Sequence, residues 1–249
     1  MTETTPKSPE PDCAFKDLCL DASESESLAR FWAGLLHREL LDTEDGGFAV
    51  LPDGESSEHM WVDPVPEPRS VKSRVHLDLR LAGDDVSPVV DAGATLVHER
   101  SETEGWWVLA DPDGNPFCAM PPAPPEYRRK VVPVPTPFEL VVDSADPEAQ
   151  ASWWADRTGG TAQTRPGAPY WWIEGAAGFP FAYWVFNRVP EPKTTKNRMH
   201  WDVVLAAGAG SPKALVAAGA TVLRTPDDEI HWWVLADPEG NEFCAFTPG

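Results

Sequence analysis

The chain has 249 residues, of which 42% are apolar, and a formal net charge of −20 at pH 7. This charge disfavours nucleic acid and anionic membrane surfaces as partners, because both are bound mainly through Lys and Arg. No apolar run reaches the roughly 18 residues that a membrane-spanning helix needs. The charge would attract a cationic ligand, although acidity of this kind more often serves solubility.

Two proline-rich stretches divide the chain. Residues 1–12 are polar and contain no apolar signal core, so we expect a disordered tail on a cytoplasmic protein. Residues 121–136 show no helical spacing, which predicts an extended linker. Two segments remain for folded domains, namely residues 13–120 and residues 137–249.

The first segment starts with a strand expected at residues 15–20. A helix should follow, because apolar residues between Leu28 and Leu36 recur at helical spacing. Ser23 and Glu26 have the spacing of a capping box, which predicts where this helix begins. Short strands after the helix complete a unit that we write βαβββ.

A second unit of the same kind follows in the first segment. Polar and apolar residues alternate over 75–81, which predicts a half-buried strand. Ser87-Pro88 predicts the start of a short helix, and Gly93 predicts its end. Three more strands are expected before residue 120.

The second segment repeats this order of elements. Asp146-Pro147 predicts the start of its first helix. Val65–His76 agrees closely with Val189–His200, and Trp106–Cys118 is nearly identical to Trp232–Cys244. Both copies of the second pair read as a strand, a tight Asp-Pro-x-Gly turn and another strand. The chain is therefore interpreted as four βαβββ units in two tandem domains.

Cys118 and Cys244 occupy equivalent places in the repeat. Each then belongs to its own domain, which argues against a disulfide framework and fits a reducing compartment. A nucleophilic role would require a cationic neighbour to lower the thiol pKa, and a buried apolar role is more common.

Paired βαβββ units with a Gly-Ala step after the second helix and an Asp-Pro-Glu-Gly-Asn turn before the last strand resemble the vicinal oxygen chelate superfamily. This is the group of glyoxalase I, bleomycin-resistance proteins and extradiol dioxygenases. The strings are most similar to those of glyoxalase-like domains common in actinobacteria. The resemblance implies an α+β fold in which each domain is a curved mixed sheet, with helices on its convex face and a ligand cup on its concave face.

The resemblance also implies where metal-using members place their ligands, on the first strands and the closing strand. His76 and His200 stand at one such position, and Cys118 and Cys244 stand where a carboxylate is expected. Because each domain keeps only part of the set, we expect no cofactor. A divalent metal bound by His200, Glu139 and Cys244, with His76 as the first-domain counterpart, is the alternative.

The histidines also have a structural interpretation. Asp78 and Asp202 lie two residues after His76 and His200 and therefore face the same side of each strand. A hydrogen bond to Asp or to the backbone would explain both histidines without a metal or catalysis.

Tryptophan is unusually frequent, with 12 in the chain, and several occur as adjacent pairs in expected strands. In such a pair one ring must face each side of the sheet. Cup-facing rings could stack on a flat ligand or bind a cation. The expected cup residues are Trp61, His76, Asp78, Trp107, Cys118, Glu139, Trp172, Trp184, His200, Asp202, Trp233 and Cys244.

These features favour a small-molecule binding protein of the glyoxalase and bleomycin-resistance type, which takes an aromatic or cationic metabolite or antibiotic without a complete metal triad. The alternative is an enzyme of the same superfamily, either a metal-dependent lyase, isomerase or dioxygenase, or a metal-independent natural-product enzyme that uses His and Asp as acid and base. We expect a monomer whose two domains act as a pseudo-dimer, with no nucleic acid or membrane partner.

Overall fold

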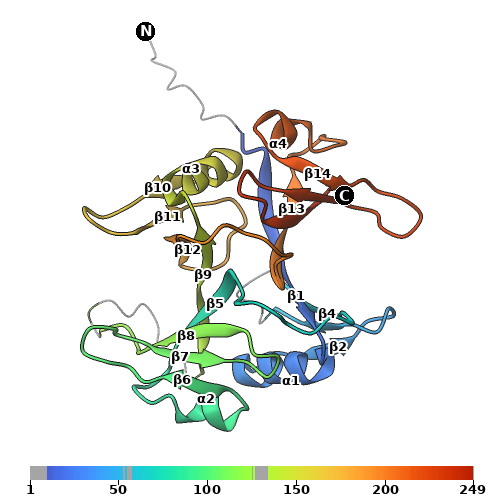
Figure 1. Cartoon of the computed structure of the whole chain (residues 1–249). Helices are drawn as coiled ribbons and strands as arrows, with labels where there is room; N and C mark the ends of the chain where they lie inside the picture. The colour runs from blue at the N-terminus through green and yellow to red at the C-terminus, as the bar shows by residue number, and fades with distance from the viewer. Residues whose placement is uncertain (1–9, 53, 55–57, 125, 127–133, 249) are drawn as a thin grey trace.

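The computed structural model describes residues 10–52, 54, 58–124, 126 and 134–248 (Figure 1). Residues 1–9 of the expected tail, and half of the expected linker (residues 125 and 127–133), lie outside this part. Asp12, which the tail was expected to include, pairs with Arg157 at 3.0 Å and joins the folded structure. No helix in the described part is long and apolar enough to cross a membrane.

The described residues form two mixed sheets of eight strands each. Neighbouring strands of the first sheet, sheet A, are in order β14 (Thr221–Arg224), β15 (Trp233–Ala236), β16 (Glu242–Phe246), β13 (Met199–Leu205), β1 (Cys13–Ala22), β4 (Met60–Pro64), β3 (Phe48–Val50) and β2 (Leu40–Asp42). Those of sheet B are β10 (Thr161–Gln163), β11 (Tyr170–Glu174), β12 (Tyr183–Arg188), β9 (Thr136–Ser144), β5 (Val75–Arg80), β8 (Pro116–Met120), β7 (Trp107–Ala110) and β6 (Thr95–His98).

The α+β class and the four βαβββ units are confirmed, but the pairing of units differs from expectation. Sheet A joins the first unit to the fourth, and sheet B joins the second to the third. At the centres, β1 pairs antiparallel with β13, and β5 pairs antiparallel with β9. The expectation that each segment encloses its own cup is therefore wrong. A repeat shows which units are equivalent, whereas strand pairing decides which units share a sheet.

The hydrophobic core lies between the two sheets, around helices α1 (Ser25–Leu36) and α3 (Pro147–Thr158). From α1, Trp32 contacts Phe117 of β8 with ring centroids 5.4 Å apart. From α3, Trp154 contacts Trp184 of sheet B at 4.9 Å and Trp201 of sheet A at 5.3 Å. Figure 1 shows each helix beside strands of its own chain segment. Two short helices, α2 (Ser87–Asp91) and α4 (Lys213–Ala217), complete the fold.

The helix starts were predicted with mixed success. Asp146 caps α3, because its carboxylate accepts from the Ala149 N–H at 3.3 Å. The capping box at Ser23 is wrong, since Glu24 is the N-cap of α1 and makes no side-chain cap bond. The Ser23 hydroxyl instead donates to Asp113 at 2.7 Å, and so ties the first unit to the turn of the second.

The repeated hairpin turn joins sheet A to helix α3. Buried Asp237 accepts hydrogen bonds from the Glu239 N–H at 3.0 Å, the Asn241 N–H at 2.9 Å and the Trp154 Nε1–H at 3.1 Å. Gly240 adopts φ +84°, which L side chains rarely adopt. The turn therefore holds the closing hairpin and also positions the helix beneath it.

Candidate functional site

Sheet B carries a hollow of about 640 Å³, which we call pocket B. A volume in this range is typical of small-molecule sites. Strands β5, β8, β9, β11 and β12 supply most of the lining. The lining residues are His76, Asp78, Arg80, Trp106, Cys118, Met120, Phe138, Glu139, Val141, Arg165, Tyr170, Trp172, Glu174, Tyr183, Val185 and Asn187.

Strand alternation and one bulge position the polar centre of pocket B. His76, Asp78 and Arg80 face the hollow because they alternate along β5. The register between β5 and β9 shifts after Asp78, which pairs with Glu139, whereas Leu79 pairs with Pro137. Phe138 is the additional residue at this irregularity, so both Phe138 and Glu139 reach the hollow.

Asp78 organises one side of this centre. Its Oδ1 atom lies 2.6 Å from His76 Nδ1 and accepts from the backbone N–H of Cys118 at 2.7 Å. Burial opposes the charged imidazole, but the neighbouring Asp78 outweighs this effect and raises the pKa of His76. The structural interpretation of His76, a histidine tied to an aspartate, therefore matches the geometry.

Glu139 is the unusual group of pocket B. Burial raises its pKa from 4.5 to about 7, and the charge of Asp78 adds to the effect. Arg80 and His76 act in the opposite direction. Glu139 thus lies near the midpoint of its titration at neutral pH. Burial also raises the pKa of the Cys118 thiol, which argues against a thiolate nucleophile there.

Aromatic rings form the walls around this centre. The five rings in the lining are Trp106, Phe138, Tyr170, Trp172 and Tyr183. The Arg80 guanidinium lies 3.8 Å from the centroid of Phe138 and donates to the Pro121 carbonyl at 2.9 Å, so its position is fixed. The Trp172 Nε1–H donates to Glu174 at 2.9 Å. Stacking surface therefore surrounds a small number of polar groups.

Three of the expected tryptophans belong to the core and not to a cup. Trp107 is 7% exposed and Trp184 is 0% exposed, and both pack in the hydrophobic core. Trp233 packs against that core as well. In each Trp-Trp pair of the repeated hairpins, the second ring packs in or against the core and the first ring does not. Trp106 consequently lines pocket B, and Trp232 stacks on Phe246 with centroids 5.4 Å apart.

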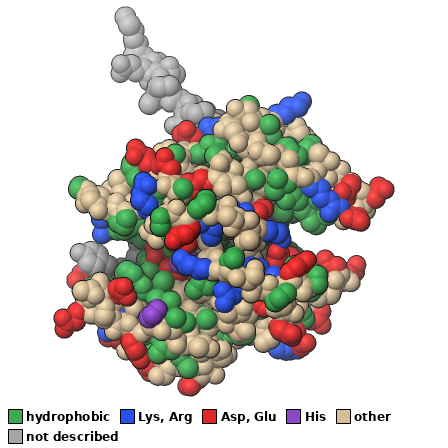
Figure 2. Space-filling view, viewed as in Figure 1, with side chains coloured by type: hydrophobic (Ala, Val, Ile, Leu, Met, Phe, Trp, Pro, Cys, Tyr) green, Lys and Arg blue, Asp and Glu red, His purple; other side chains and the backbone are tan. Residues whose placement is uncertain are grey.

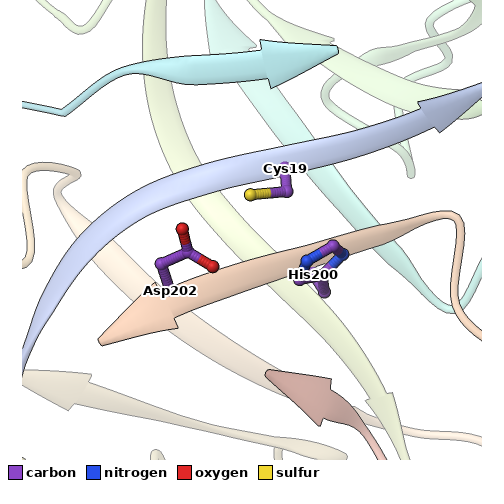
Figure 3. Close-up of side chains that lie close together, drawn as sticks. All are labelled: Cys19, His200 and Asp202. Carbon is purple, nitrogen blue, oxygen red and sulfur yellow. The ribbon is translucent and has the colours of Figure 1, made fainter. Parts of the chain in front are cut away.

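Sheet A brings together a different set of side chains. Cys19 on β1 lies opposite His200 on β13, and Asp202 follows two residues later on the same strand. One ligand atom from each of the three lies within 4.8 Å of the others, and Figure 3 shows them gathered between the two strands. Cys244 on β16 is also close, with its Sγ atom 3.7 Å from His200 Nε2.

Burial dominates the electrostatics of this cluster, and it outweighs Lys16 and the Cys19 and Cys244 thiols, which favour the ionised form of Asp202. Burial raises the pKa of Asp202 to about 7 and lowers that of His200 to about 4. It also raises the pKa of the Cys19 thiol well above its usual value. Among the described residues, the buried His200 Nδ1 and Asp202 Oδ1 atoms have no hydrogen-bond partner. Such unsatisfied atoms are costly unless a ligand binds them.

The cluster therefore fits a borderline-soft divalent metal. Thiol sulfur, imidazole nitrogen and carboxylate oxygen are the ligand types of zinc. The corresponding set on sheet B, formed by His76, Asp78 and Cys118, is less suitable, because His76 and Asp78 already bond to each other. The alternative ligand set of His200, Glu139 and Cys244 is wrong, since Glu139 lies on sheet B beside Asp78.

Sequence reasoning missed Cys19, because its strand was not expected to share a sheet with β13. The signal was present in Asp17, Cys19 and Asp21, which alternate along β1.

Trp61, an expected cup residue, lies on β4 of sheet A. Its Nε1–H donates to Asp17 at 3.1 Å, and its ring stacks on His59 at 5.2 Å.

Comparison with known proteins agrees with this architecture. The chain is similar in structure to glyoxalase I from Zea mays, with a TM-score of 0.63 and 14% identity over 94% of this chain and 92% of that one. It is also similar to a Bacillus subtilis protein provisionally described as a dioxygenase, with a TM-score of 0.64 and 12% identity over 97% of this chain and 87% of that one. At these identities the likeness concerns the fold.

No curated protein sequence matches the chain. The profile of the glyoxalase-like domain matches it twice, over residues 17–120 and 139–246. These two matches cover most of the chain and correspond to the two segments of the repeat. The chain therefore belongs to the glyoxalase-like domain family.

Proposed function

We propose that the protein binds a flat aromatic small molecule with a positively charged or hydrogen-bond-donating group in pocket B. The observation that carries this proposal is the combination of a hollow of about 640 Å³ and five aromatic rings around the Asp78–Glu139 pair. The rings would stack on a flat ligand, and the carboxylates would bind its polar group.

The carboxylates support a cation more than an anion. Pocket B contains Asp78, Glu139 and Glu174 as acids. These three acids outnumber the two arginines of the pocket, Arg80 and Arg165, and both arginines lie over aromatic rings, at 3.8 Å from Phe138 and 5.8 Å from Trp172. A ligand cation beside Glu139 would favour the ionised carboxylate and so lower its pKa.

A fluorescence titration with the tricyclic cation proflavine tests this proposal, with anthracenesulfonate as an anion of similar shape. Saturable binding of proflavine and at least about tenfold weaker binding of the sulfonate, equal to about 1.4 kcal/mol, are expected. Binding of the wild type should strengthen as pH rises through 7, because Glu139 ionises there.

Two matched variants separate the buried carboxylate from the general acidity of the chain. Glu139→Gln should remove the pH dependence of proflavine binding. Glu174→Gln removes an exposed carboxylate of the same pocket and should retain that dependence. Equal affinities for the cation and the anion, or an unchanged pH profile in Glu139→Gln, would argue against the proposal.

A second proposal concerns sheet A, where we infer that Cys19, His200 and Asp202 bind a zinc-like divalent metal. Cys244 lies close enough to His200 to be a further ligand. The unpartnered His200 Nδ1 and Asp202 Oδ1 atoms favour it. A bound zinc ion would supply Lewis acidity toward an oxygen of a ligand or water. Burial keeps His200 neutral, as a metal ligand must be.

Metal content measured by mass spectrometry after zinc loading and dialysis tests this second proposal. The wild type should retain zinc, and Cys19→Ser and Asp202→Asn should lose most of it. Cys118→Ser, the variant at the repeat position of Cys244 on sheet B, should retain it. Equal zinc content in Cys19→Ser and Cys118→Ser, or no retained zinc in the wild type, would contradict the assignment.

The four cysteines are all free thiols in the structure. This supports our proposal that the protein works in a reducing compartment such as the cytoplasm.

A further inference from the structure

The repeated stretch at residues 65–76 and 189–200 contributes only its terminal histidines, His76 and His200, to pocket B and to the sheet A cluster. The other residues of the stretch have no part in either site. The structure brings its two copies together. Arg74 Nη1 donates to the Glu191 carbonyl at 2.8 Å, and Arg198 Nη1 donates to the Glu67 carbonyl at 2.8 Å. Each copy thus reaches into the other through an equivalent bond, so the two copies form one structural feature.

A cavity of about 320 Å³ lies where the copies meet. Five basic side chains line it, namely Arg69, Lys72, Arg74, Lys196 and Arg198. They are a quarter of the 20 Lys and Arg residues in a chain of net charge −20. Figure 2 shows several Lys and Arg side chains gathered near the middle of one face, among carboxylates. Like charges repel, so this concentration requires a compensating negative charge.

Carboxylates of the protein compensate only part of this charge. Lys72 pairs with Asp143 at 2.9 Å, Lys196 pairs with Asp21, and Arg198 pairs with Asp113 at 3.1 Å. The remaining carboxylate of the lining, Glu67, is exposed, and no ion pair joins it to these cations in the described part of the chain.

Two arginines of the cavity are left with carbonyl partners. Arg69 donates to the Val71 carbonyl at 3.2 Å, and Arg74 donates to the carbonyls of Asp143 and Glu191. The Nε–H groups of Arg74 and Arg198 are buried and have no hydrogen-bond partner among the described residues. The cavity therefore retains the positive charge of Arg69 and Arg74, which no ion pair with a carboxylate balances in the described part of the chain.

We propose that this cavity binds a small polyanion of the phosphate class, such as pyrophosphate or the phosphate group of a metabolite. Guanidinium groups match the geometry of phosphate oxygens. The hydroxyl groups of Ser70 and Thr195 are also in the lining and can donate to the same oxygens. Cations reach the cavity from both copies of the stretch, which suits a ligand with negative charge at both ends.

Isothermal titration with inorganic pyrophosphate at fixed ionic strength tests this site, with sulfate as a second probe. The wild type should bind pyrophosphate saturably, with one equivalent per chain, and should bind sulfate more weakly. Arg69→Gln should weaken pyrophosphate binding about tenfold, because it removes an exposed guanidinium whose one hydrogen bond to the described residues goes to a carbonyl.

Arg188→Gln is the matched control, since Arg188 is also exposed and also donates to one carbonyl, that of Ala145 at 2.9 Å, but lies outside the cavity. Its affinity should equal that of the wild type. Lys72→Gln, at an exposed side chain of the cavity, should weaken binding independently. The proposal is overturned if pyrophosphate gives no saturable heat, if sulfate binds equally well, or if the Arg69 and Lys72 variants bind like Arg188→Gln.

Discussion

Replacing Glu139 with Gln should make the protein more stable at pH 8 and leave its stability at pH 4.5 nearly unchanged. Burial and Asp78 raise the pKa of Glu139 from 4.5 to about 7. The folded chain therefore keeps this proton up to about pH 7, whereas the unfolded chain releases it near 4.5. Since the folded state binds more protons in this interval, stability falls as pH rises through it.

The size of the effect follows from the shift. Each pKa unit corresponds to about 1.36 kcal/mol, so ionising Glu139 costs the fold at most about 3 kcal/mol above pH 7. Glutamine keeps the shape of the side chain and cannot ionise. We expect Glu139→Gln to raise the free energy of unfolding by about 1–3 kcal/mol at pH 8.

Urea denaturation at pH 4.5 and pH 8 measures the difference. Glu174→Gln, which removes an exposed carboxylate of the same pocket, should change the free energy of unfolding by less than about 0.5 kcal/mol at either pH. A Glu139→Gln protein that is equally stable or less stable than the wild type at pH 8 would refute the reasoning, because burial would then not oppose the charge.

Three further predictions concern other parts of the fold. Asp202→Asn should likewise stabilise the protein, and much more at pH 8 than at pH 4.5 when chelator is present, because burial raises the pKa of Asp202 from 3.8 to about 7; denaturation showing no gain at pH 8 would count against it. Asp237→Ala should lower the free energy of unfolding by about 2–4 kcal/mol, since it leaves buried donors of Trp154 and the turn unpaired, and a loss below about 1 kcal/mol would show that the turn does not hold the helix. Arg74→Met should lower the free energy of unfolding by about 2–3 kcal/mol through its two lost carbonyl bonds, and a melting curve identical to that of the wild type would show that these bonds do not hold the two repeated stretches together.

Local features of the fold were readable from the sequence. The strands of the repeat and the buried stripe of α1 follow from hydrophobic spacing, and Asp146 follows from its place before Pro147. The capping box failed for a tertiary reason, since Ser23 has a stronger partner in Asp113 of the next unit. Local patterns of this kind do not include partners that lie 90 residues away.

The full set of residues in pocket B and in the sheet A cluster could not be predicted from such local patterns. Alternation placed His76 and Asp78 on one face, but nothing local indicates that Glu139 lies opposite Asp78 or that Cys19 lies opposite His200. Both contacts arise because sheet A combines the first and fourth units and sheet B combines the second and third. The phase of the Trp-Trp pairs was likewise undetermined, since alternation shows that one ring faces the cup and not which of the two.

The two cups have different chemistry although they come from equivalent units. Glu139 on sheet B corresponds to Asp17 on sheet A, which Lys16 and the Trp61 indole bind. Val141 opposite His76 corresponds to Cys19 opposite His200. Pocket B is thus lined by rings around a titrating carboxylate, and sheet A offers a thiol, an imidazole and a carboxylate. We therefore do not expect pocket B and the sheet A cluster to bind the same ligand.

The central claim is that the ligand binds in pocket B, and proflavine titration of one variant pair tests it most directly. Trp106 and Trp232 begin equivalent hairpins, but Trp106 lines pocket B and Trp232 stacks on Phe246 in sheet A. We predict that Trp106→Ala weakens proflavine binding about tenfold, since stacking on one ring contributes about 1 kcal/mol or more, and that Trp232→Ala leaves it unchanged. Equal affinities of the two variants, or a loss confined to Trp232→Ala, would contradict the assignment of the ligand to pocket B.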